Sequence, residues 1–146
     1  MPSDMQQFLS FHLGEAECAV DLSLVHEVIR CTGITRCAGL EDTFAGAIHR
    51  HGEFLPVVYL HQQGARSTRP ADSNTRILVL DAAGYEVGVL IDHLGEIIYL
   101  ASPTIQPLPH WMSAAKAPYF KGLSAIDGRW LLILAPSRLL PEHSAI

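Results

Sequence analysis

Short segments rich in hydrophobic residues recur along almost the whole chain. In some of them hydrophobic and polar residues alternate, and others are continuous apolar runs. The first covers residues 8–13, and the alternation resumes at 18–22 after a Gly14-Glu15 step. A period of two places successive side chains on opposite faces of a sheet, and glycine permits a tight turn. The beginning of the chain therefore predicts a β-hairpin.

A short helix is expected after this hairpin. Ser23 can accept a hydrogen bond from a free backbone N–H and so act as an N-cap. The apolar residues that follow have helical spacing over one or two turns, and they are Leu24, Val25, Val28 and Ile29.

A second hairpin is predicted between Phe44 and Tyr59. Two apolar runs enclose His51-Gly52-Glu53, where glycine supplies the positive φ that a tight reversal needs. Pro56 has no N–H to donate, so we expect it at an edge or a bulge rather than in the middle of a sheet.

The second half of the chain repeats this pattern. A buried strand is predicted at 77–80 and returns at 87–91, and Asp127-Gly128 favours a type I′ hairpin turn because both residues tolerate positive φ. Residues 64–74 contain almost no apolar side chain and predict a mobile connector. Short strands with regular turns indicate an all-β fold built from small barrels.

Composition narrows the function classes. With 146 residues, of which 49% are hydrophobic, the chain can form one compact domain or two small lobes that share a core, but not a multidomain enzyme. A net charge of -5 with scattered Lys and Arg offers no basic stripe for nucleic acid. No apolar run approaches the roughly 20 residues that cross a bilayer. The odd set Cys18, Cys31 and Cys37 suits reduced thiols in the cytosol.

Candidate chemistry is sparse. On a strand, His49 and His51 would share a face and could bind zinc or copper, but no carboxylate or cysteine stands at ligand spacing, so surface histidines are the favoured interpretation. The serines lack a nucleophile elbow, and the glycines form no phosphate-binding loop. Asp92 and Glu96 are interpreted as solvated or structural carboxylates rather than as a catalytic pair. We therefore predict no enzyme, no metal and no cofactor.

Seven blocks, in order and from about Phe8 to Leu140, resemble the family of CheW-like domains. The blocks read FLSFHLGEAECAVDL, VHEVIR, GAIHRHGEFLPVVYL, TRILVL, VGVLIDHLGEII, GLSAIDGRWLLIL and SRLL. Each block alone is a common β-protein pattern, so the evidence lies in their order. The resemblance implies a single CheW-like domain over 1–146, made of two five-stranded SH3-like β-barrel subdomains with short helices and a hydrophobic groove between them.

The function implied by the resemblance is a non-catalytic adaptor. One surface would meet the cytoplasmic tip of a chemoreceptor, and another would meet the regulatory domain of a CheA-type histidine kinase. Such a protein is cytoplasmic, does not insert into the membrane and is recruited to receptor arrays that control chemotaxis or pilus-driven motility. The kinase-contacting residues are not indicated. The receptor-binding residues carried over from the resemblance are Val25, Glu27, Val28, Ile29, Gly46, Ile48, His49, His51 and Gly52.

Three positions depart from the family pattern. His49, His51 and Tyr59 stand where the family has Asn, Arg and Asp. In the family the counterpart of Glu27 pairs with that arginine, so the resemblance predicts a Glu27–His51 pair that forms only with a protonated ring. Receptor binding would then weaken as pH rises through the histidine range.

Two other functions remain open on the sequence alone. One is an interaction module of the same fold outside chemosensory signalling, which a pulldown that recovers no kinase would indicate. The other is a histidine-rich metal-binding protein, which elemental analysis of the purified chain would reveal.

Overall fold

Ten strands form two five-stranded sheets in the computed structural model, which describes residues 5–31, 44–60, 74–101, 105–108 and 119–139. Sheet A has the order β8 (His93–Ala101), β1 (Met5–Leu13), β2 (Ala16–Asp21), β10 (Arg129–Leu134) and β9 (Phe120–Ile126). Sheet B has the order β3 (Val25–Arg30), β6 (Arg76–Ala82), β7 (Tyr85–Ile91), β5 (Glu53–Val58) and β4 (Phe44–Arg50). Two short 3-10 helices, η1 (Leu22–Leu24) and η5 (Pro136–Leu139), complete the described elements. The predicted all-β fold is confirmed.

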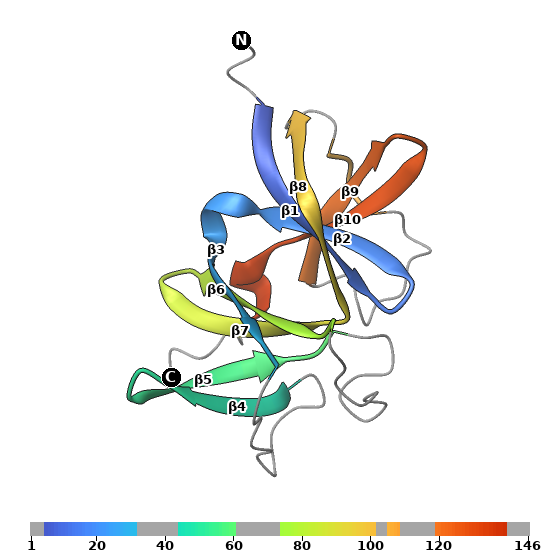
Figure 1. Ribbon diagram of the computed structural model, residues 1–146. Helices are drawn as coiled ribbons and strands as arrows, with labels where there is room; N and C mark the ends of the chain where they lie inside the picture. The colour runs from blue at the N-terminus through green and yellow to red at the C-terminus, as the bar shows by residue number, and fades with distance from the viewer. Residues whose placement is uncertain (1–4, 32–43, 61–73, 102–104, 109–118, 140–146) are drawn as a thin grey trace.

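The two sheets repeat one pattern of strand pairing. Sheet A pairs β8–β1 and β1–β2 antiparallel, β2–β10 parallel and β10–β9 antiparallel. Sheet B follows the same sequence through β3–β6, β6–β7, β7–β5 and β5–β4. The strands of sheet B are consecutive along the chain, and those of sheet A come from both ends around them. Figure 1 shows sheet A above and sheet B below.

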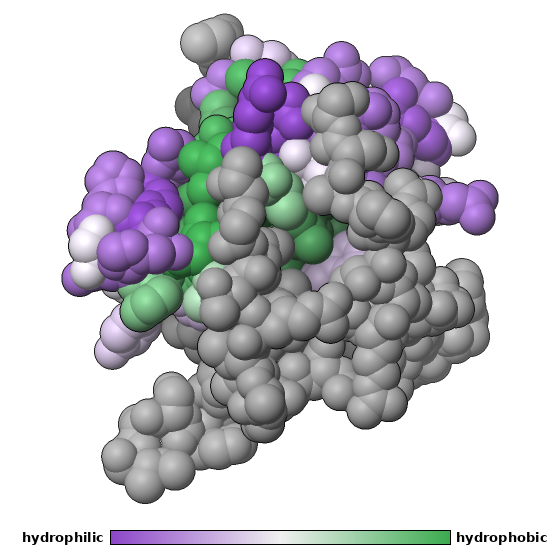
Figure 2. Space-filling model, turned by 60° about the horizontal axis from the view of Figure 1, so that its bottom comes forward, coloured by the Kyte–Doolittle hydropathy of each residue, from purple (hydrophilic) through white to green (hydrophobic). Residues whose placement is uncertain are grey.

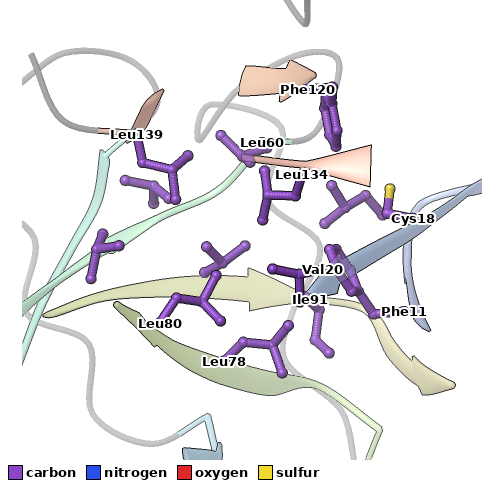
Figure 3. Packing of buried hydrophobic residues seen from close by; sticks show 14 of the residues in the cluster. Phe11, Cys18, Val20, Leu60, Leu78, Leu80, Ile91, Phe120, Leu134 and Leu139 are labelled. Atoms are coloured by element: carbon purple, nitrogen blue, oxygen red, sulfur yellow. The ribbon is translucent and has the colours of Figure 1, made fainter. Parts of the chain in front are cut away.

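One hydrophobic cluster joins the sheets. It combines Phe11 and Val20 of sheet A with Leu78, Leu80 and Ile91 of sheet B, and all five are fully buried. Figure 3 shows their side chains converging between strands of different sheets. Of two smaller clusters, one belongs to sheet A and the other to sheet B. The largest of the three clusters is therefore the one that the two sheets share.

The local turn predictions are largely confirmed. β1 and β2 form the first hairpin. His51 and Gly52 have φ of 53° and 82°, and Asp127 and Gly128 have φ of 48° and 78°, the positive pairs that type I′ turns require. The connector predicted at 64–74 lies outside the described residues except for Asn74.

The predicted helix at 24–29 is wrong. Asp21, not Ser23, caps a single 3-10 turn, since its side chain accepts the Ser23 backbone N–H at 2.9 Å. From Val25 the chain is strand β3, paired with β6. Helical spacing over so few residues is a weak signal, and β-branched valines and isoleucine fit a pleated surface when a partner strand is present.

The edge position predicted for Pro56 is also wrong. β5 lies between β7 and β4, so it is an inner strand. Its ladder to β7 joins Val57 to Gly88 and Val58 to Val89, so the proline stands just before the ladder begins. The missing N–H therefore breaks none of these pairings.

Two glycines allow close packing, which gives a first prediction. A Cβ on Gly122 would lie 2.4 Å from the backbone oxygen of Gln106, whereas one on Gly88 would lie 2.8 Å from the Ile77 methyl Cγ2. A backbone atom cannot move aside as a side chain can. We expect Gly122→Ala to lower the free energy of unfolding by about 1–3 kcal/mol and Gly88→Ala by less, measured by urea denaturation. An equal loss in both variants would contradict this explanation.

Candidate functional site

Five ionisable side chains of sheet B form one connected group, here called the Arg50 cluster: His26, Glu27, Arg50, Asp81 and Glu86. Arg50 donates from Nη2 to the Glu27 carboxylate and from Nη1 to Glu86 Oε1 at 3.1 Å. The other Glu86 oxygen, Oε2, lies 2.7 Å from His26 Nδ1, and His26 Nε2 lies 3.8 Å from Asp81 Oδ2. The Arg50 side chain is only 17% exposed, while those of its partners Glu27 and Glu86 are 45% and 42% exposed.

The cluster is a consequence of sheet curvature. Glu27 lies on β3 and Arg50 is the last residue of β4, and these strands are the two opposite edges of sheet B. Their ion pair means that the sheet curls until its edges approach each other. Curling of this kind is consistent with the barrel-like subdomain that the resemblance implies.

The contacts within the cluster favour the charged forms of Glu86 and Arg50. The pKa of Glu86 is lowered, chiefly by its hydrogen bond with His26; burial opposes this, and the charge of Arg50 and its hydrogen bond lower the pKa further. The hydrogen bond to Glu27 raises the pKa of Arg50. The Glu86 carboxylate therefore stabilises the fold above its ordinary pKa, and this contribution is lost as pH falls through the lowered value. Since Glu86 is 42% exposed, the contribution is small.

The predicted Glu27–His51 pair is corrected by these contacts. Glu27 pairs with Arg50, one residue earlier along the chain. His51 occupies the hairpin turn with φ of 53°, beyond the end of β4. A residue-by-residue match to the family pattern placed the arginine at position 51, although an arginine was present beside it. The guanidinium contact is therefore kept rather than replaced by an imidazolium.

The two predicted histidines have different surroundings. His49 lies against Phe54, with ring centroids 5.1 Å apart, while His51 is exposed in the turn. They do not share a strand face, because the strand ends at Arg50. Within the described ranges, no group of three or more His, Cys, Asp or Glu side chains is placed to hold a metal.

The other residues carried over for receptor binding fall into two groups. Val28 is 36% exposed beside Glu27, and Gly52 is exposed in the turn. Ile48 is 6% exposed and belongs to the core of sheet B. The remaining residues of this set are partly buried or buried and contribute little surface of their own: Val25, Ile29 and Gly46.

An open hollow adjoins the Arg50 cluster, and sequence reasoning missed it. Phe54 is 71% exposed and Tyr85 is 69% exposed, and both line a hollow of about 700 Å³ between the β4–β5 hairpin and the start of β7. Arg50 and Glu86 line it as well. The sequence signal was weak, because Phe54 lies within an apolar run and Tyr85 follows a turn glycine. We call this feature the aromatic hollow.

Sheet A carries a matching arrangement. Arg129, beside the Asp127-Gly128 turn, lies 3.0 Å from Glu17 on β2 and 3.6 Å from Glu96 on β8. Glu17 and Glu86 are the second residues of corresponding strands. Trp130 follows its turn glycine by two positions, as Phe54 does, and it is 57% exposed. Each sheet thus presents an arginine between two glutamates and an exposed aromatic ring.

Further apolar side chains reach the surface of sheet A. Met5, Ile97 and Tyr99 are 40%, 50% and 56% exposed on the neighbouring strands β1 and β8. On the face drawn in Figure 2, hydrophobic residues form a band bordered by hydrophilic ones. Mixed surfaces of this kind are typical of protein-binding proteins.

The acidic pair considered in the sequence is not assembled. Asp92 Oδ2 accepts the Gly14 backbone N–H at 2.6 Å, while Glu96 lies beside Arg129. Each carboxylate therefore has a structural contact of its own. Among the described residues, no helix has the length and apolar character needed to span a membrane.

Comparisons with known proteins agree with this fold. The family model described as CheW-like domain matches residues 7–144. A chemotaxis protein CheW from Klebsiella aerogenes is 29% identical over 94% of this chain and 83% of its own length. Its counterpart from Bacillus subtilis is 21% identical over 96% and 90%. The crystal structure of the scaffolding protein TtCheW from Thermoanaerobacter tengcongensis superposes with a TM-score of 0.78, covering 88% of this chain and 83% of that one, at 23% identity.

Proposed function

Since this chain belongs to the family of CheW-like domains and is a coupling adaptor of chemotaxis, we propose that it joins a chemoreceptor tip to the regulatory domain of a CheA-type histidine kinase. The observation that supports this best is the family match over residues 7–144, together with exposed apolar side chains around the Arg50 cluster. Binding to a receptor would bring the protein to the membrane array. No chemical step is assigned to the adaptor.

The receptor tip docks on the β3 side of the Arg50 cluster in this proposal. Val28 supplies an exposed apolar contact, and Glu27 is held in place by Arg50. The backbone of Gly52 lies open in the adjoining hairpin turn, with nothing near the position of an added Cβ. An apolar helix with one cationic or amide group would match this surface.

The kinase domain docks in the aromatic hollow. Phe54 and Tyr85 are large exposed rings next to a hollow, and aromatic anchors of this type dominate the energy of many protein interfaces. Arg50 contacts Glu27 on the receptor side and Glu86 on the hollow side. A single guanidinium therefore lies at the border of the two proposed docking surfaces, where a coupling protein needs a physical link.

The aromatic hollow gives a second prediction. Phe54→Ser should weaken binding to a purified CheA-type regulatory domain by about thirtyfold, since removal of an aromatic anchor costs about 2 kcal/mol. Phe54 is mostly exposed, so the free energy of unfolding should change little. Isothermal titration calorimetry measures the affinity. The matched control is Trp130→Ser, which removes the corresponding ring of sheet A.

The proposal as a whole is tested by a pulldown with the purified protein from cells that carry a chemosensory array. Mass spectrometry should recover both a kinase of the CheA type and a chemoreceptor. Recovery of other proteins without either partner would favour an interaction module of this fold outside chemosensory signalling.

A further inference from the structure

His26 occupies an unusual position next to the proposed docking surfaces. It precedes Glu27 on β3, and side chains at successive positions of a regular strand point to opposite faces. Here both side chains reach the Arg50 cluster. The register of β3 against β6 shifts between Val25 and Glu27, so His26 is the extra residue of a β-bulge. Bulges re-aim side chains in this way and are common beside functional sites.

We propose that His26 and Glu86 are positioning residues of the docking site, and that proton uptake by His26 strengthens partner binding. This inference rests on the proposed function, because it describes how that same site is regulated. It differs from the Glu27–His51 pair expected from the resemblance, since the titrating ring lies on β3 and acts through Glu86.

The contacts define how the effect is transmitted. One carboxylate contacts two side chains: Glu86 Oε2 faces His26 Nδ1 at 2.7 Å, and Glu86 Oε1 accepts from Arg50 at 3.1 Å. Arg50 in turn holds Glu27, the next residue after His26. The ring is thus connected to its own neighbour through β7 and β4. When Glu86 holds the His26 ring in place, the backbone of the bulge is held as well, and the bulge directs Glu27 toward Arg50.

The net charge of the cluster determines whether a proton on His26 strengthens or weakens it. The groups that face His26 are Glu86 from β7 and Asp81 from β6, and beyond Glu86 lies Arg50 with Glu27. Three carboxylates and one guanidinium leave two negative charges uncompensated, and a protonated ring reduces this to one. A protonated ring adds an ion pair to the contact with the Glu86 carboxylate, so loss of the ring proton should loosen the cluster.

The first experiment measures receptor-tip affinity from pH 5.5 to 8.5 for the wild type and two variants. Wild-type affinity should fall by about fivefold, because the contact between His26 and Glu86 loses its ion-pair component. His26→Gln and Glu86→Gln should both flatten the profile, whereas His26→Lys should hold affinity near the acid value. His51→Gln is the matched control and should keep the wild-type slope.

The second experiment needs no partner and separates the inference from the proposed function. NMR should show the Arg50 side-chain Nε–H signal shifting with the titration of His26 in the free protein, and Glu86→Gln should make the two independent. An Arg50 signal that ignores His26, or wild-type and His26→Gln affinity profiles of equal slope, would overturn the inference. Absence of receptor and kinase binding at every pH would instead reject the proposed function.

Discussion

Replacing Arg50 with alanine is expected to weaken binding of both partners by about thirtyfold or more, while the fold remains intact. Arg50 contacts carboxylates on both sides of the border between the two proposed docking surfaces, and its loss leaves Glu27 and Glu86 without their guanidinium. Arginines at interface centres often contribute about 2 kcal/mol or more, which corresponds to this change in affinity. Arg50 is only 17% exposed, but its partners Glu27 and Glu86 are 45% and 42% exposed, so each ion pair contributes about 1 kcal/mol to stability and the shift in thermal unfolding should be modest.

The chain provides a matched control for this change. Arg129→Ala removes a guanidinium from the corresponding pair of glutamates in sheet A, away from the proposed surfaces. Its affinity for receptor and kinase should equal that of the wild type in surface plasmon resonance. Arg50→Lys should restore only part of the binding, because an ammonium cannot present a planar fork to two carboxylates. Equal losses in the Arg50→Ala and Arg129→Ala variants would contradict the assignment of the site to sheet B.

Truncation of Leu78 to alanine should cause the largest loss of stability, about 2–5 kcal/mol in urea denaturation. Leu78 is fully buried in the cluster that joins the sheets, so its removal leaves a cavity that both sheets line. Leu94→Ala is the control, because Leu94 is 38% exposed and should lose less than about 1 kcal/mol. Both variants should unfold in one transition, since the sheets share their main core. A separate, unaffected transition of sheet A would show that the two cores are independent.

The strands and turns could be predicted because their causes are local. Alternation with a period of two identified β1, and buried apolar runs identified β6 and β7. Glycine identified the tight reversals after His51 and Asp127, the second of which was predicted to be type I′. The helix expected from 24 to 29 was wrong because its apolar spacing suits either structure over such a short length. Pairing of β3 with β6, about fifty residues later, decided between them.

The candidate site was predicted only in part. Glu27 and Val28 came from a family resemblance; the structure places Glu27 in the Arg50 cluster, and Val28 is exposed at the next position of β3. Arg50 was overlooked because the comparison of motifs, position by position, matched the arginine of the family to His51. His51 lies in the hairpin turn, and Arg50, at the end of β4, is the residue that reaches Glu27. The pairs Arg50–Glu86 and His26–Glu86 span 36 and 60 residues of sequence. No local pattern connects such distant positions.

By itself the sequence determined the secondary structure type, most reversals and the family of this protein, because these depend on periodicity, on glycine and on the order of short motifs. Only the tertiary structure decided that sheet B curls until β3 meets β4, and that a bulge at His26 turns two successive side chains to one cluster. The physical reason is that curvature and bulges arise from strand pairing and from a core shared between the sheets. Both depend on contacts between residues far apart along the chain.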